Sequence, residues 1–334
     1  KFFDVVTYTG NGTAGRTVAH NLGSVPAMMI VKCTNASATE WIIYHTSLGA
    51  TKYLLFTTGA AGTFTNFWND TAPTDSVFSL GVNGQVNGNG DSFVAYLFAS
   101  DAGGYGDDGS ENIIKCGSVT TDGSGNASVD VGFEPQWCLW KCVDAAGGNE
   151  HGNWRINDVM RGWPVPDASN AFGYPSSLYP NTNGAETISG VDGFVKSATG
   201  FGFGQVQANK TYIYMAIRRP MKTPTAGTEV FAPVGATTTA PLWKSSFPVD
   251  MGWYRYIIGT SASTYIGSRL TGTDRFETSI ASLPVTDSTF KWDYMNGWFD
   301  NSFSDTNYVG YNFKRGAGFM DVISYAGNST AGTT

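Results

Sequence analysis

The sequence predicts an all-β protein built from tandem β-sandwich modules, jelly-roll-like in character, with little helix. The 334 residues include 42 Gly and 13 Pro, and 14% of them are aromatic and 14% charged. Such a composition is typical of many short strands joined by tight turns. Segments of the sequence recur at fixed spacing, which indicates repeated modules. No window keeps a 3.6-residue apolar period over a dozen residues, so we expect little helix.

The longest recurrence joins the two ends of the sequence. Residues 3–15 (FDVVTYTGNGTAG) return 317 positions later as residues 320–332 (MDVISYAGNSTAG). Asp, Val, Tyr, Gly, Asn, Thr and Ala recur without a gap, which chance does not supply. We therefore expect one full period followed by the opening strand of a further copy.

A shorter sequence repeat occurs within this period. A Gly-x-x-Pro turn and a Lys-Cys pair each occur twice, 109 positions apart, at residues 23–26 and 132–135 and at residues 32–33 and 141–142. Trp41 follows the first pair and Trp154 follows the second, after a loop that is four residues longer. Similar aromatic strands close three segments, at residues 92–98, 211–217 and 307–313.

The repeats and the Gly- or Pro-rich linkers between them predict the domain organisation. We expect module 1 at residues 1–101, its sister module 2 at 111–220, a more distant module 3 at 221–317, and the opening strand of a further repeat at 318–334. Residues 28–32 and 137–141 are nearly continuous apolar runs, typical of central strands. In both, a proline precedes the run instead of interrupting its hydrogen bonds.

Charge and hydropathy exclude two classes of partner. The net charge is −7, and the 20 Lys and Arg residues are scattered, whereas a nucleic-acid surface needs them clustered. No apolar run approaches the roughly 20 residues that span a bilayer, so we expect no membrane insertion. Unpaired strand edges need covering, so we expect the partners to include copies of this chain.

Motifs of nucleophilic or metal chemistry are missing from the sequence. The cysteines, at positions 33, 116, 138 and 142, match no zinc or redox spacing, and we expect small buried side chains. His20, His45 and His151 stand in unrelated contexts, and no Gly-x-Ser-x-Gly motif occurs. We therefore expect no catalytic residues, no metal site and no cofactor.

Carboxylate pairs, which cleave glycans, are the remaining catalytic option. Asp107, Asp108 and Glu111 lie in a glycine-rich linker, where nothing holds them in position. That linker also lacks the alternating acidic residues of a calcium loop. Asp274 and Glu277 have odd spacing, which puts them on opposite faces of a strand. The sequence therefore predicts a protein that is not an enzyme.

Aromatic residues give the one candidate binding site. Strand parity puts Trp292, Tyr294 and Trp298 on one face if residues 291–298 are extended, and Asp293 and Asn296 lie between them. Such a face stacks on sugar rings, while the neighbouring polar groups bond to hydroxyls. The alternative is that these rings pack two sheets together as core residues.

Several of these segments together resemble a domain repeated in bacteriophage virion proteins, namely tail fibres and related structural proteins of marine and cyanobacterial phages. The segments that carry the resemblance in modules 1 and 2 are residues 3–15, 20–26, 29–32, 41–45, 53–55, 94–98, 154–156 and 211–216. Module 3 is similar more loosely, at residues 268–272 and 311–315. The family offers no catalytic residues to carry over.

The resemblance implies a structural protein of the virion surface, a tail fibre or other appendage that assembles with itself and other virion proteins. Such an appendage contacts polysaccharide of the host surface. The alternatives are a carbohydrate-binding adhesin or cell-surface filament protein and, less favoured by the sequence, a polysaccharide-degrading enzyme.

Overall fold

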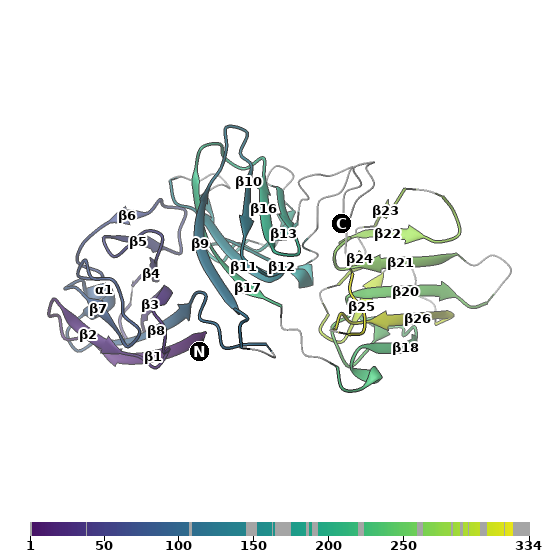
Figure 1. Cartoon of the computed structure of the whole chain (residues 1–334), viewed down its shortest axis with the longest axis horizontal. Coiled ribbons are helices and arrows are strands. Elements are labelled where there is room, and N and C mark those ends of the chain that lie inside the picture. Colours follow the sequence, from purple (N-terminus) through teal and green to yellow (C-terminus); the bar gives the residue numbers. More distant parts are fainter. Residues whose placement is uncertain are drawn as a thin grey trace. The chain divides into compact units, whose positions relative to one another are not determined.

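Strands make up almost all regular structure of the protein (Figure 1). The computed structural model describes residues 2–37, 39–106, 109–144, 152–161, 163, 175–184, 187–188, 193–219, 224–258, 263–281, 283–287, 290–292, 294–300, 306–316 and 318–322. Helical turns in these residues are α1 (Gly84–Asn87), η2 (Val159–Arg161) and η3 (Gly227–Glu229). The all-β prediction is confirmed. None of these short helical turns in the described residues is long and apolar enough to span a bilayer.

Contacts divide the chain into two compact units. The first comprises Lys1–Ile156, Leu178–Glu186 and Ala198–Arg219, and the second comprises Asn157–Ser177, Thr187–Ser197 and Pro220–Thr334. We name the strands β1–β8 repeat 1, the strands β9–β17 repeat 2, and the strands β18–β26 repeat 3. The module boundaries expected from the sequence stay predictions, since compactness groups repeat 1 with most of repeat 2.

Repeat 1 is a large sheet covered on one face by a small one. The large sheet has the order β1-β8-β3-β4-β5-β6, and β2 pairs with β7 in the small sheet. The bounds are β1 (Phe3–Thr9), β2 (Arg16–Ala19), β3 (Pro26–Cys33), β4 (Ile42–His45), β5 (Lys52–Leu55), β6 (Gly62–Thr63), β7 (Val77–Leu80) and β8 (Ser92–Ala99). We call the face toward the small sheet the inner face and the opposite one the outer face.

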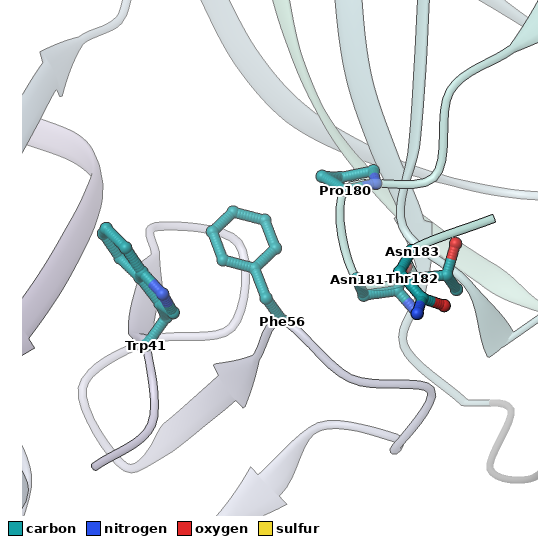
Figure 2. Close-up of a pocket in the computed structure, with 6 residues that line it drawn as sticks. All are labelled: Trp41, Phe56, Pro180, Asn181, Thr182 and Asn183. Atoms are coloured by element: carbon teal, nitrogen blue, oxygen red, sulfur yellow. The ribbon is translucent and has the colours of Figure 1, made fainter. Parts of the chain in front are cut away.

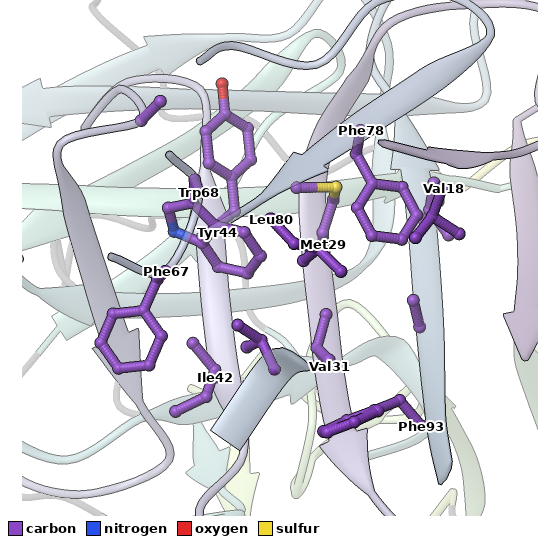
Figure 3. Packing of buried hydrophobic residues seen from close by; sticks show 14 of the residues in the cluster. Val18, Met29, Val31, Ile42, Tyr44, Phe67, Trp68, Phe78, Leu80 and Phe93 are labelled. Carbon is purple, nitrogen blue, oxygen red and sulfur yellow. The ribbon is translucent and has the colours of Figure 1, made fainter. Parts of the chain in front are cut away.

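The inner face of repeat 1 carries its own core (Figure 3). Val31 and Ile42 from the large sheet pack with Phe78 from β7 and with Trp68 from the loop before it, and all four are at most 1% exposed. Alternate residues of β3 and β4 therefore point inward, as strand geometry requires. The neighbouring residues, such as Ile30 and Ile43, point to the outer face.

Repeat 2 follows the same plan. Its large sheet has the order β12-β11-β17-β9, and β10 pairs with β16 as β2 pairs with β7. A register shift between Pro26 and Met28 recurs between Pro135 and Trp137, so each proline sits at a bulge, where it interrupts no ladder bond. The bounds are β9 (Ile114–Thr120), β10 (Ala127–Asp130), β11 (Pro135–Cys142), β12 (Arg155–Asp158), β16 (Gly200–Gly204) and β17 (Thr211–Arg218).

The outer faces of repeats 1 and 2 pack against each other and form a further core. Met28, Ile43 and Leu54 of repeat 1 and Leu139 and Met215 of repeat 2 belong to one buried cluster. Polar contacts cross the same interface: the His45 imidazole Nε2 lies 3.1 Å from the Tyr214 carbonyl oxygen, and the Trp154 indole donates to the Leu55 carbonyl at 2.7 Å. The two repeats are therefore joined by a continuous apolar interior.

Repeat 3, in the second unit, has the same topology again. Its large sheet runs β18-β26-β20-β21-β22-β23, which matches β1-β8-β3-β4-β5-β6 strand for strand, and β19-β25-β24 is its small sheet. The bounds are β18 (Phe231–Gly235), β19 (Trp243–Lys244), β20 (Met251–Tyr256), β21 (Thr264–Ser268), β22 (Asp274–Glu277), β23 (Val285–Thr286), β24 (Phe290–Lys291), β25 (Gly297–Asp300) and β26 (Tyr308–Phe313).

Aromatic rings fill the inner core of repeat 3, and glycines make room for them. A Cβ at Gly310 would lie 2.3 Å from Trp243 Cδ1, and one at Gly252 would lie 2.4 Å from Trp298 Cε2. The two indoles stack with centroids 4.1 Å apart. Buried Asn312 accepts the Trp298 indole N–H at 2.8 Å, which satisfies a donor that would otherwise be costly to bury.

The remaining described strands belong to the second unit, at β13 (Ser176–Ser177), β14 (Thr187–Ile188) and β15 (Gly193–Lys196). Phe194 of β15 stacks on Trp163 with centroids 4.9 Å apart. Near the end of the chain, Arg315 forms an ion pair with Asp321. The strand expected within residues 318–334 lies mostly outside the described residues, because these end at residue 322.

Candidate functional site

The two tryptophans that the sequence suggested for sugar stacking lie in the core of repeat 3. Trp292 is 3% exposed and Trp298 is fully buried, and their rings stack on each other at 5.2 Å. The run between them is not extended, because β24 ends at Lys291 and β25 begins at Gly297. The predicted stacking face is therefore wrong for these two rings, and the alternative, core packing, holds.

The other three members of that candidate site do not restore it. Tyr294 is half-buried with its ring 6.3 Å from that of Phe299, and Asn296 is exposed in the turn before β25. Asp293 lies outside the described residues. No aromatic platform for a sugar remains at this place in the described residues.

The histidines and cysteines have structural environments. His20 accepts the Leu22 N–H at 3.3 Å and lies 3.2 Å from the Thr74 carbonyl. Burial lowers the pKa of His45 to about 4, so this imidazole is neutral at pH 7. All four cysteines are buried and none forms a disulfide, as expected for small apolar side chains. His151 lies outside the described residues.

Acidic residues show no metal-binding grouping in the part of the chain that the structure describes. Glu111 pairs with Arg218 at 2.6 Å, and Asp101 pairs with Lys115 at 2.5 Å. Glu277 accepts a hydrogen bond from Ser279. Among the described residues, no three His, Cys, Asp or Glu side chains gather as metal ligands would. Asp107 and Asp108 are outside that set.

A groove of about 610 Å³ opens in the first unit beside Trp41 (Figure 2). Its apolar wall is formed by the rings of Trp41, which precedes β4, and Phe56, which follows β5. The facing wall is the segment Pro180, Asn181, Thr182 and Asn183 from repeat 2. Trp41 is 38% exposed, so one face of an aromatic ring is open to a ligand and polar side chains stand opposite.

The walls of the groove are held by contacts with neighbouring residues. The Trp41 ring packs against Tyr96 at 6.5 Å between centroids, and the Lys32 ammonium lies 5.7 Å from its centroid. On the facing wall, the Asn181 carboxamide accepts the Trp154 backbone N–H at 2.8 Å and donates to Asn153 at 2.8 Å. Both Trp41 and Asn181 are therefore positioned before any ligand binds.

The groove is one of two equivalent places in the interface between repeats 1 and 2. Trp41 precedes β4 as Trp154 precedes β12, and the pairing of Ile43 with Leu54 corresponds to that of Ile156 with Leu178. Counting two residues onward from each leucine makes Phe56 the equivalent of Pro180. Each tryptophan therefore faces the same element of the other repeat, as in a two-fold contact.

The two equivalent places differ in what fills them. Phe56 packs on Trp154 with centroids 5.0 Å apart, and Trp154 is 1% exposed. At the other place the equivalent residue is Pro180, whose small ring leaves Trp41 partly uncovered. The groove is thus the place where the sister position has a phenylalanine ring packed on its tryptophan.

The lysines beside the two tryptophans differ in burial in the same way as the tryptophans do. Lys141 lies 5.9 Å from the centroid of the Trp154 ring and donates to the Gly152 carbonyl. Burial lowers the pKa of Lys141 to about 8. Lys32, its equivalent, donates to the Thr39 carbonyl and is only half-buried. Neither lysine lines the groove, so the groove itself carries no charged side chain.

Comparison with known protein families matches residues 2–220 to the family described as Domain of unknown function (DUF7483). The chain belongs to this family. The match spans repeats 1 and 2 together, which agrees with the apolar interior that joins them. No curated protein and no solved structure matches the chain.

Sequence reasoning missed the Trp41 groove because its two walls come from segments about 140 residues apart. The equivalence of Trp41 and Trp154 is visible in the sequence, but that of Phe56 and Pro180 requires the strand register of the folded sheets. The usable signal was a difference between the two repeats: an aromatic residue, Phe56, stands two residues after Leu54 in repeat 1, whereas Pro180 stands two residues after Leu178 in repeat 2.

Proposed function

We propose that this chain is a structural protein of a phage virion surface, a tail fibre or other appendage, which binds glycans of the host surface in the Trp41 groove. The observation that carries the first part is the threefold use of one two-sheet topology along the chain. Repeated modules that contact their neighbours build extended assemblies economically. The sequence resemblance to repeated virion domains supports the same assignment.

The composition of the groove supports glycan binding. An open indole face accepts the apolar face of a pyranose ring, while the Asn181, Thr182 and Asn183 side chains offer amide and hydroxyl groups for sugar hydroxyls. An apolar guest would leave those polar groups without partners. Since no charged side chain lines the groove, the ligand class is a neutral saccharide.

The groove contains no group that could cleave a glycosidic bond. Its six lining residues include no carboxylate, whereas glycoside hydrolysis generally uses two of them. This supports binding without cleavage. A carbohydrate-binding adhesin or cell-surface filament is the second candidate, because the same groove would serve it equally well.

Labelling of the source particle separates these two candidates. Antibodies against the full chain, visualised by immunogold electron microscopy, should mark appendages on purified virions, and mass spectrometry should find the chain among virion proteins. Gold confined to the cell envelope would refute the virion assignment and favour the adhesin. Glycan binding is tested separately on a glycan array, where neutral saccharides should bind wild type and not Trp41→Ala.

A further inference from the structure

The outer face of repeat 3 carries a row of exposed apolar side chains. Cross-strand pairing aligns Pro233, Tyr311, Trp253, Ile266 and Phe276 across five neighbouring strands. Trp253 is 40% exposed, Tyr311 39% and Phe276 40%. Apolar rows of this extent on one face of a soluble domain mark an interaction surface.

The equivalent row of repeat 1 is covered at its β4 and β5 end, whereas Val5 at the β1 end is 46% exposed. Pairing there aligns Val5, Tyr96, Ile30, Ile43 and Leu54. Ile43 is fully buried and Leu54 is 1% exposed, because repeat 2 covers them with its own outer face. The same sheet position is therefore an interface in the first unit and exposed in the second.

A second row strengthens the equivalence. Phe3, Phe98 and Met28 align in repeat 1, and Phe231, Phe313 and Met251 align in the same order in repeat 3. The two phenylalanine pairs have the same centroid separation of 5.0 Å. The residue types as well as the positions are kept.

We propose that the outer face of repeat 3 binds the outer face of repeat 3 in a second copy of this chain. Repeats 1 and 2 give the geometry, since they are sister repeats joined through this face by reciprocal contacts. A homotypic pair is the two-fold symmetric form of that contact. The inference does not depend on the proposed function.

A charged residue at the margin of this face, Arg255, is compatible with pairing. Arg255 lies four residues after Met251, as Lys32 lies four residues after Met28. Lys141 is the equivalent of Lys32 in repeat 2, because each lies six residues after the proline that begins its strand. Lys141 is completely buried between the paired repeats, so a cation at this position is tolerated within such an interface. The apolar row itself bears no charge, which favours a protein sheet over a charged partner.

Sedimentation of the full chain tests the proposal. Wild type should sediment as a dimer at micromolar concentration, and Trp253→Glu should weaken dimerisation by about a hundredfold, because a central aromatic residue dominates such interfaces. Val82→Glu is the matched control, since Val82 is 48% exposed and belongs to repeat 1, so it is not part of this face. A wild-type chain that stays monomeric up to about 100 µM, or a Trp253→Glu dimer as stable as wild type, would overturn the proposal.

Crosslinking tests the same contact without weakening the dimer. Trp253 lies on the third strand of six, near the centre of the face, so a two-fold pair brings both copies of this residue close together. Trp253→Cys should therefore form a disulfide-linked dimer on mild oxidation, and Val82→Cys should not. The four native cysteines are buried and do not compete. Equal crosslinking of the two variants would contradict the proposed contact.

Discussion

Trp41 and Trp154 hold equivalent positions in two sister repeats, but Trp41 is 38% exposed and Trp154 is 1% exposed. The difference arises across the interface, where Phe56 covers Trp154 and Pro180 faces Trp41. The difference between Phe56 and Pro180 thus decides which of the two equivalent tryptophans is a core residue and which lines the groove.

Truncation of the two tryptophans should have unequal effects on stability. Trp154→Ala removes a buried ring and its hydrogen bond to Leu55, so we expect a loss of about 3–5 kcal/mol in the free energy of unfolding. Trp41→Ala should cost about 1 kcal/mol, as is usual for partly exposed positions. Urea denaturation followed by circular dichroism measures both. Equal losses would show that the two positions are not packed as described.

Gly310 should not tolerate a methyl group. A Cβ there would lie 2.3 Å from Trp243 Cδ1, so Gly310→Ala should lower the free energy of unfolding by about 1–3 kcal/mol through overpacking. Gly235→Ala is the control on a neighbouring strand, because no atom lies within 4 Å of the Cβ that it would gain. Thermal denaturation should leave the control near wild type. A Gly310→Ala protein as stable as that control would refute the close approach of the indole.

Acid should destabilise the interface between repeats 1 and 2 through His45. Burial lowers its pKa from 6.5 to about 4, so the unfolded chain takes up this proton at a higher pH than the folded chain does. The contribution is therefore complete above pH 6.5 and is lost as pH falls toward 4. It amounts to about 3 kcal/mol at most. In denaturant titrations between pH 7 and 4, His45→Gln should have a shallower pH dependence than wild type, and an unchanged slope would count against this assignment.

The thiols should be unreactive in the folded protein. All four cysteines are buried, and burial raises the pKa of the Cys116 and Cys138 thiols above the usual range. Since the thiolate is the reactive form, Ellman's reagent should release little colour from native protein and four equivalents after denaturation. Rapid reaction of any cysteine under native conditions would place it at the surface.

The fold class and the positions of the central strands were accessible from sequence. The prolines at residues 26 and 135 predicted the start of the central strands. The motifs that recur 109 positions apart predicted sister repeats. The packing of repeat 2 on the outer face of repeat 1 was not predicted, although a signal was present. Residues 28–31 are apolar at every position, which indicates a strand buried on both faces and not the half-covered sheet of a single sandwich.

The candidate site could not be predicted as well. The alternation of side chains along a strand shows which residues share a face, but not whether that face is buried. Parity cannot say whether Trp292 and Trp298 face solvent or a second sheet, and here they face the aromatic core of repeat 3. The exposed tryptophans among the described residues are Trp41 and Trp253, and their exposure depends on which repeat packs on which. That choice is made by tertiary contacts between segments far apart in sequence.

The substitution Pro180→Phe tests the central claim, that the groove exists because a phenylalanine is missing and that it binds a neutral saccharide. The added ring should pack on Trp41 as Phe56 packs on Trp154, and contribute about 1 kcal/mol of stability. In calorimetric titrations with the neutral saccharide that binds best on an array, wild type should bind and Pro180→Phe should lose binding at least about tenfold, a change of roughly 1.4 kcal/mol, with Trp41 still present. Undiminished binding by a folded Pro180→Phe protein would contradict the account.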